Sequence, residues 1–100
     1  MKYKHTQTIK SCPIDNATLA KEVGDLYYDS LALFLAELAK KLKSDADADS
    51  KRGRKKLANA LYQASKDIES ASKEIEKAWE ICEPFVKEWL VKNGSNRKDF

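Results

Sequence analysis

The sequence predicts an all-α protein folded as a long antiparallel helical hairpin. The main observation is a row of small and apolar residues spaced alternately four and three apart, which is typical of helices packed lengthwise. The row consists of Leu57, Leu61, Ala64, Ile68, Ala71, Ile75, Ala78, Cys82, Phe85 and Trp89. The 100 residues also include only three glycines and two prolines, which favours long uninterrupted helices. A chain of this length forms one domain with a modest core.

Alanine recurs every seventh residue in the middle of the row, at Ala64, Ala71 and Ala78. Side chains this small leave little bulk between two backbones. The row therefore predicts a seam along which a partner helix approaches closely.

Residues 1–14 have no helical period and are interpreted as a flexible N-terminal arm. Pro13 disfavours a helical backbone at Cys12. Asp15 or Asn16 is a good N-cap for the first helix, which we expect to run to about Lys43.

Between Leu26 and Ala39 the first helix is apolar nearly all round. Such a helix must be covered on more than one face, and one antiparallel partner from the same chain covers a single stripe. We therefore expect a homodimer in which two hairpins pair through the exposed sides of this segment into a four-helix bundle.

Residues 44–50 (SDADADS) are expected to form the turn, or the turn plus the first turn of the second helix, because they include helix-capping residues and no large apolar side chain. Their aspartates would complement the positive end of the next helix dipole. The second helix should then begin at Asp49 or Lys51 and run through Cys82.

Pro84 conflicts with a regular second helix. It lacks a backbone donor and crowds the preceding turn, which predicts a kink, or a break followed by a short third helix. The helical domain is expected to span residues 15–94, followed by a frayed tail over residues 95–100.

Composition places the chain among folded, water-soluble proteins, with 42% hydrophobic and 35% charged residues. The apolar stretch 26–39 is shorter than the roughly 20 residues that cross a bilayer. Residues 1–14 contain no apolar segment typical of a secretory signal. We expect a cytoplasmic protein that does not enter membranes, with Cys12 and Cys82 reduced.

A basic cluster lies just beyond the expected turn, although the net charge of +3 alone indicates no polyanionic partner. Its five cations are Lys51, Arg52, Arg54, Lys55 and Lys56. Such clusters bind phosphate backbones, and Arg52-Gly53-Arg54 resembles the core of an AT-hook without the flanking prolines. A charge run is more often a solvated surface, so polyanion binding is the alternative hypothesis.

The aspartates at 45, 47 and 49 have the spacing that opens a calcium-binding loop. Ser50 and Lys56 stand where such a loop requires glycine and glutamate, so helix capping is the better interpretation.

His5, Cys12 and Cys82 are too few for a closed zinc site and have no paired ligand spacing. A Cys82–His5 dyad would need the arm to dock on the seam, where a cysteine acts as a small apolar residue. The glutamates of the second helix alternate with lysines outside the row and form a solvated face. We predict neither catalytic activity nor a metal or cofactor.

The C-terminal aromatic residues are the strongest candidate for a binding surface. Trp79, Val86 and Leu90 lie beside the row and widen its apolar arc, and tryptophan is a usual anchor of protein interfaces. The alternative is that these residues cap the core by packing on the start of the first helix. With surplus apolar residues of the first helix included, the predicted protein interface is Trp79, Val86, Trp89, Leu90, Leu26 and Leu33.

The sequence thus favours a small non-catalytic protein–protein interaction module, such as an adaptor, inhibitor or assembly factor. A nucleic-acid-binding regulator that uses the basic tip is the alternative.

Overall fold

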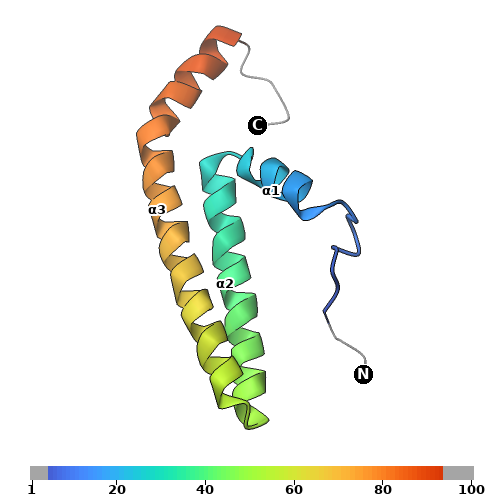
Figure 1. The fold of residues 1–100 in the computed structure, drawn as a ribbon. Helices are drawn as coiled ribbons and strands as arrows, with labels where there is room; N and C mark the ends of the chain where they lie inside the picture. Colours follow the sequence, from blue (N-terminus) through green and yellow to red (C-terminus); the bar gives the residue numbers. More distant parts are fainter. Residues whose placement is uncertain (1–4, 94–100) are drawn as a thin grey trace.

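The computed structural model describes residues 5–93, and within this range the chain is all-helical, which confirms the predicted class. Its helices are α1 (Asn16–Gly24), α2 (Tyr28–Lys51) and α3 (Lys55–Asn93). α2 and α3 lie side by side and run in opposite directions, while α1 lies beside the start of α2 (Figure 1). The radius of gyration is 17.4 Å, against about 13 Å for a compact domain of this length. The molecule is therefore elongated.

Small side chains at seven-residue spacing form the contact between α2 and α3. They are Ala32, Ala39 and Ala46 on α2, and Ala58, Ser65 and Ser72 on α3. All six are buried. Such side chains allow two helix backbones to approach closely.

Two buried hydrogen bonds fix the register of the two helices. The Ser65 hydroxyl donates to the Ala39 carbonyl at 2.7 Å, and the Ser72 hydroxyl donates to the Ala32 carbonyl at 2.6 Å. Seven residues forward on α3 thus correspond to seven residues backward on α2. The same step in the other direction places Ala58 opposite Ala46.

The row predicted from the sequence is not the buried contact with α2. None of its ten residues is buried, although Leu61, Ile68 and Ile75 are half-buried. The buried row lies one position further along, at residues 58, 65 and 72. The predicted row did not include Ser65 and Ser72, but a serine whose hydroxyl bonds to a backbone carbonyl fits an interior as alanine does.

The predicted helix from residue 15 to residue 43 is divided into α1 and α2. Asp15 is the N-cap, as predicted, and its carboxylate accepts a hydrogen bond from the Thr18 amide at 2.8 Å. α1 ends at Gly24, a residue of low helix propensity, and the Asp25 amide closes its last turn on the Lys21 carbonyl at 3.0 Å.

The predicted turn at residues 44–50 is wrong, because this segment belongs to α2. Ala46 is completely buried against α3. The Asp45 carboxylate pairs with the Lys41 ammonium at 2.6 Å, and Asp47 accepts a hydrogen bond from the Tyr62 hydroxyl. The aspartates thus bind other side chains, and the packing of Ala46 outweighs the local preference for a cap.

The turn comprises Arg52, Gly53 and Arg54. Gly53 has a φ of 81°, a left-handed conformation that glycine adopts without steric cost. The cluster of cations therefore lies at the turn itself and at the adjoining helix ends.

Pro84 lies inside α3, which runs unbroken to Asn93. The predicted short helix after a break at Pro84 is therefore absent from the described residues. The C-terminal part of α3 bends in Figure 1, in keeping with the hydrogen bond that a proline removes. In the predicted N-terminal arm, described from residue 5, Ile9 pairs with Cys12. The predicted frayed tail lies outside the described residues.

We expect Ala39→Leu to force α2 and α3 apart. Leucine adds bulk where the Ser65 hydroxyl meets the Ala39 carbonyl, and overpacking costs about 1–3 kcal/mol. Ala60→Leu, at an exposed position of α3, should change the stability by no more than about 0.5 kcal/mol. Thermal unfolding followed by circular dichroism compares the two variants. Equal unfolding midpoints for the two variants would contradict the dependence of the α2–α3 contact on small residues.

We also expect α1 to loosen in acid. The hydrogen bond from Thr18 lowers the pKa of Asp15 below its ordinary value of 3.8. A carboxylate whose pKa is lowered by folding stabilises the fold above its ordinary pKa, and this contribution is lost as the pH falls through the lower folded value. The amide proton shift of Thr18 should titrate with Asp15 in NMR spectra. Asp15→Asn should abolish that titration.

Candidate protein-interaction surface

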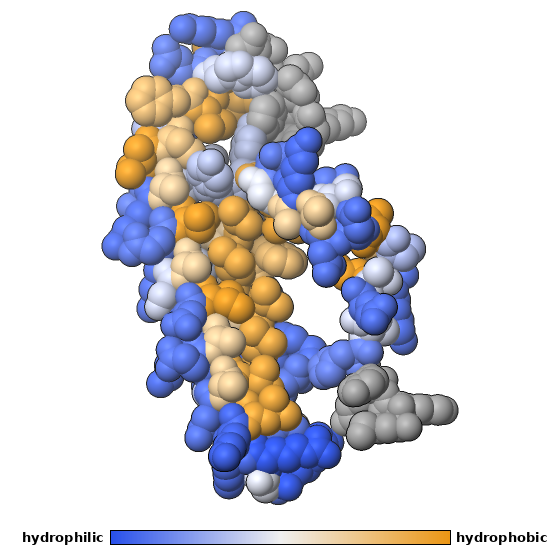
Figure 2. Space-filling view, viewed as in Figure 1, coloured by the Kyte–Doolittle hydropathy of each residue, from blue (hydrophilic) through white to orange (hydrophobic). Residues whose placement is uncertain are grey.

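One side of the α2–α3 pair presents an uncovered apolar face, seen as the continuous orange surface in Figure 2. Its residues flank the buried small row on the same side of both helices, and all of them are half-buried or exposed. We call it the open face. It consists of Leu31, Leu35, Leu38 and Leu42 from α2, and of Leu57, Leu61, Ala64, Ile68, Ala71, Ile75 and Ala78 from α3.

The other side of the pair is mainly polar, although Leu33 lies there with most of its surface exposed. Tyr62 donates its hydrogen bond to Asp47 there, which raises the pKa of Tyr62 above its ordinary value of 10.0. Glu69 and Lys73 form an exposed ion pair at 3.7 Å. The open face, by contrast, contains no charged residue. The two sides of the helix pair therefore differ in the partners that they can accept.

The chain exposes more surface than a compact monomer of its size. Its accessible area is 8216 Å², whereas a folded monomer of 11.4 kDa exposes about 5,800 Å². The buried apolar residues in the described part of the chain are four alanines, and no large side chain there is fully buried. The contact between α2 and α3 thus buries methyl groups and leaves leucine and isoleucine on the open face.

The C-terminal part of α3 extends beyond the start of α2 (Figure 1). Trp79 continues the seven-residue series of Ser65 and Ser72, and so lies level with the loop that precedes α2. Its ring stacks on Tyr27 with centroids 5.6 Å apart and planes at 30°. Past Trp79, α3 has no length of α2 beside it. We call residues 80–93 the overhang.

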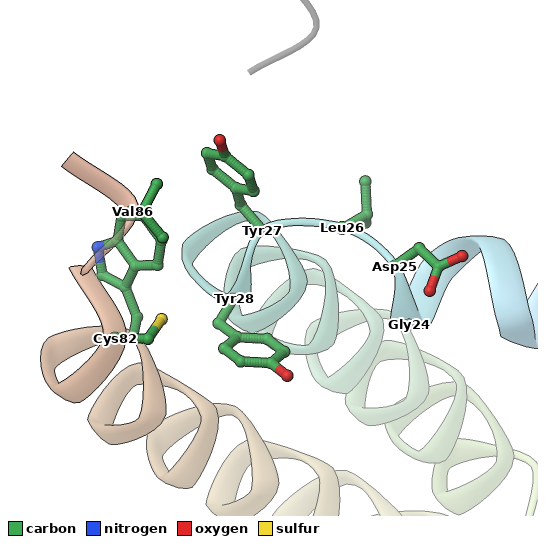
Figure 3. A pocket seen from close by; sticks show the side chains of 8 residues that line it. Gly24, Asp25, Leu26, Tyr27, Tyr28, Cys82 and Val86 are labelled. Atoms are coloured by element: carbon green, nitrogen blue, oxygen red, sulfur yellow. The ribbon is translucent and has the colours of Figure 1, made fainter. Parts of the chain in front are cut away.

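Two adjoining grooves lie where the loop before α2 meets α3, and Figure 3 shows the first of them. The first, about 280 Å³ in volume, is lined by Gly24, Asp25, Leu26, Tyr27, Tyr28, Trp79, Cys82 and Val86. The second, about 240 Å³, is lined by Tyr27, Cys82, Phe85, Val86 and Trp89. The walls of the second groove are apolar, which suits apolar side chains of a partner, whereas the first groove is lined by polar as well as apolar groups.

The structure brings part of the predicted interface together. Trp79, Val86 and Leu26 line the first groove, and Trp89 lines the second. Leu90 is half-buried on the overhang.

Leu33 lies apart from the grooves, with 63% of its surface exposed on α2. Tyr27 and Phe85, which line the grooves, were absent from the predicted interface. For Phe85 a signal existed in the sequence, since the four-and-three spacing included it. Tyr27 had no such signal, because the break between α1 and α2 determines its position.

The cations of the basic cluster are partly engaged in the turn. Arg52 and Arg54 both approach the Asp49 carboxylate, at 3.9 and 3.5 Å. The Lys55 ammonium donates to the Ser50 carbonyl at 3.1 Å and to the Ser50 hydroxyl at 2.9 Å. These contacts close the last turn of α2, as cations at a helix C-terminus do.

The two remaining cations of the cluster, Lys51 and Lys56, are exposed. No ion pair joins either of them to another described residue.

The described residues contain no group of three or more His, Cys, Asp or Glu side chains arranged to hold a metal ion. Cys12 and Cys82 are free thiols. No helix between residues 5 and 93 has the length and apolar character needed to cross a membrane. Comparison with known proteins gives no match to a protein-family model, a curated protein or a solved structure.

We expect the fluorescence of Trp79 to report on its stacking with Tyr27. In a Trp89→Phe background, Trp79 is the remaining tryptophan. Tyr27→Leu removes the stacked ring, so the emission should shift to the red as water reaches the indole. Tyr62→Phe, a change on the polar side, should leave the emission unchanged. Identical spectra for the Tyr27 variant and its parent would contradict the stacked arrangement.

Proposed function

We propose that this chain is a small non-catalytic protein–protein interaction module, an adaptor, inhibitor or assembly factor that works as a cytoplasmic homodimer. The observation that supports the proposal is the open face, where leucine and isoleucine stay half-exposed along most of the length of α2. Burial of apolar surface is worth about 25 cal/mol per Å². Contiguous apolar surface on this scale marks an interaction site in a folded protein.

The excess of accessible surface is large beside the area that a protein interface covers. The accessible area of 8216 Å² exceeds that of a compact monomer by about 2,400 Å². A standard interface buries about 800 Å² on each partner.

Two copies that pack through their open faces form a four-helix bundle, with α2 and α3 contributed by each copy. Ala64, Ala71 and Ala78 follow one edge of the face. Small residues at this spacing allow a further helix to approach α3 closely. The sequence predicted that the two copies pair through the exposed sides of residues 26–39. The proposed contact includes α3 as well.

The nucleic-acid alternative has less support. Arg52 and Arg54 share the Asp49 carboxylate, and Lys55 binds Ser50. Release of these groups would be a cost of phosphate binding, and the two remaining lysines of the cluster make a weak polyanion site.

We expect Ala71→Glu to abolish self-association without unfolding the helices. Ala71 is exposed in the single chain, so a carboxylate there stays solvated until a partner covers it, and an uncompensated buried charge is strongly unfavourable. Sedimentation equilibrium should show a dimer for the parent chain and a monomer for the variant, with equal helix content by circular dichroism.

Ser70→Glu is the matched control, because it places the same charge on the adjacent exposed residue outside the open face. This control should remain dimeric. A parent chain that is monomeric at micromolar concentration would remove the homodimer, and dissociation by both variants would show that the open face is not the contact.

A further inference from the structure

The apolar surface of α3 consists of three parallel rows at seven-residue spacing, and α2 covers one of them. The covered row is Ala58, Ser65 and Ser72. Beside it lies a middle row of Leu61, Ile68, Ile75, Cys82 and Trp89, and beyond that an outer row of Leu57, Ala64, Ala71, Ala78 and Phe85. No member of the middle or outer row is buried.

The spacing of the residues in the middle and outer rows, taken together, is the same from either end of α3. Their ten members are spaced alternately four and three apart, starting and ending on a step of four. When α3 lies antiparallel on a second α3, with a two-fold axis near residue 73, each member of one row therefore meets a member of the other. The resulting pairs are Leu57 with Trp89, Leu61 with Phe85, Ala64 with Cys82, Ile68 with Ala78, and Ala71 with Ile75.

We infer that two copies of this chain associate through α3 in this antiparallel register, an inference that rests on the proposed homodimer. Each of the two pairs nearest the axis joins an alanine to an isoleucine. A small residue opposite a large one lets two helices interdigitate at close range. The ten residues carry no charge, so the contact buries no unpaired ion. At its outer edge near the axis, Glu74 is already paired with Lys77 at 3.2 Å.

Pairing in this register also covers the two apolar parts of the surface that lack a neighbouring helix, namely the overhang and the open face near the turn. The overhang is about 21 Å long at 1.5 Å per residue and has no α2 beside it. Near the turn, the open face has α2 and α3 but no third helix. Antiparallel pairing places the overhang of one copy on this part of the other.

Phe85 and Trp89, exposed to 68% and 40% in the single chain, then lie on Leu61 and Leu57 of the second copy. Each end of the dimer becomes a three-helix core. A foreign helix as long as the open face would leave Phe85, with 68% of its surface exposed, uncovered. A second copy covers both surfaces at once, and we therefore assign the site to it.

A disulfide bond tests the register directly, because it requires Cα atoms about 4.4–6.8 Å apart. In a Cys12→Ser background, Cys82 is the sole thiol. Adding Ala64→Cys should yield a covalent dimer under mild oxidation, and peptide mapping should identify links between residues 64 and 82. The matched control Ser70→Cys, on an exposed residue outside both rows, should yield no such dimer.

The outcomes separate this inference from the proposed function. A Cys82–Cys82 link in the Cys12→Ser parent would indicate parallel helices and overturn the antiparallel register. A dimer in sedimentation that forms no 64–82 link would overturn the register while the interaction module stands. A monomeric parent chain would overturn both the homodimer and the register.

A second readout does not depend on cysteine chemistry. In Trp79→Phe, Trp89 is the remaining tryptophan, and its emission should shift to the blue with rising protein concentration as Leu57 of the second copy covers the indole. Ala71→Glu in the same background should suppress the shift. Emission independent of concentration across the dimerisation range would contradict the contact between Trp89 and Leu57.

Discussion

The close contact between α2 and α3 determines the rest of this structure. Two serine hydroxyls reach backbone carbonyls of the opposite helix, Ser65 to Ala39 and Ser72 to Ala32. Contact at this range leaves no space for a large side chain between the helices. Most leucine and isoleucine side chains of α2 and α3 are therefore displaced to one flank, and mainly polar residues occupy the other.

In this arrangement, different residues fix the alignment of the helices and provide the apolar surface available for burial. Hydrogen bonds and small residues set the spacing and register of α2 and α3, but they bury little apolar surface. Most of the stabilisation available from apolar burial remains on the open face and on the overhang. The proposed assembly follows from this imbalance, because a partner on those surfaces supplies the burial that the single chain lacks.

The all-α class and the Asp15 cap could be predicted because they depend on local features, namely helical spacing and a capping side chain. The exact seam could not, because whether Ser65 and Ser72 act as interior residues depends on a carbonyl of the other helix. Ala46 illustrates the same limit, since its burial against α3 makes a helix of a segment that resembles a turn. At the candidate site, Trp79 and Val86 could be selected from the sequence. Tyr27 could not, because its place depends on the break after α1.

The seven-residue repeat of small side chains has a further consequence for the topology of the chain. Because the pattern repeats, a slip of α3 along α2 by seven residues, about 10 Å, would again set small residues against small residues and a serine against an alanine carbonyl. The short connection at Arg52, Gly53 and Arg54 disfavours this alternative alignment. A loop of three residues spans at most about 11 Å, and it would have to cover both the shift along the axis and the distance of about 8–10 Å between the helix axes. The short loop thus favours one alignment of α2 and α3 over the alignment shifted by seven residues. An insertion in the loop would make both alignments accessible.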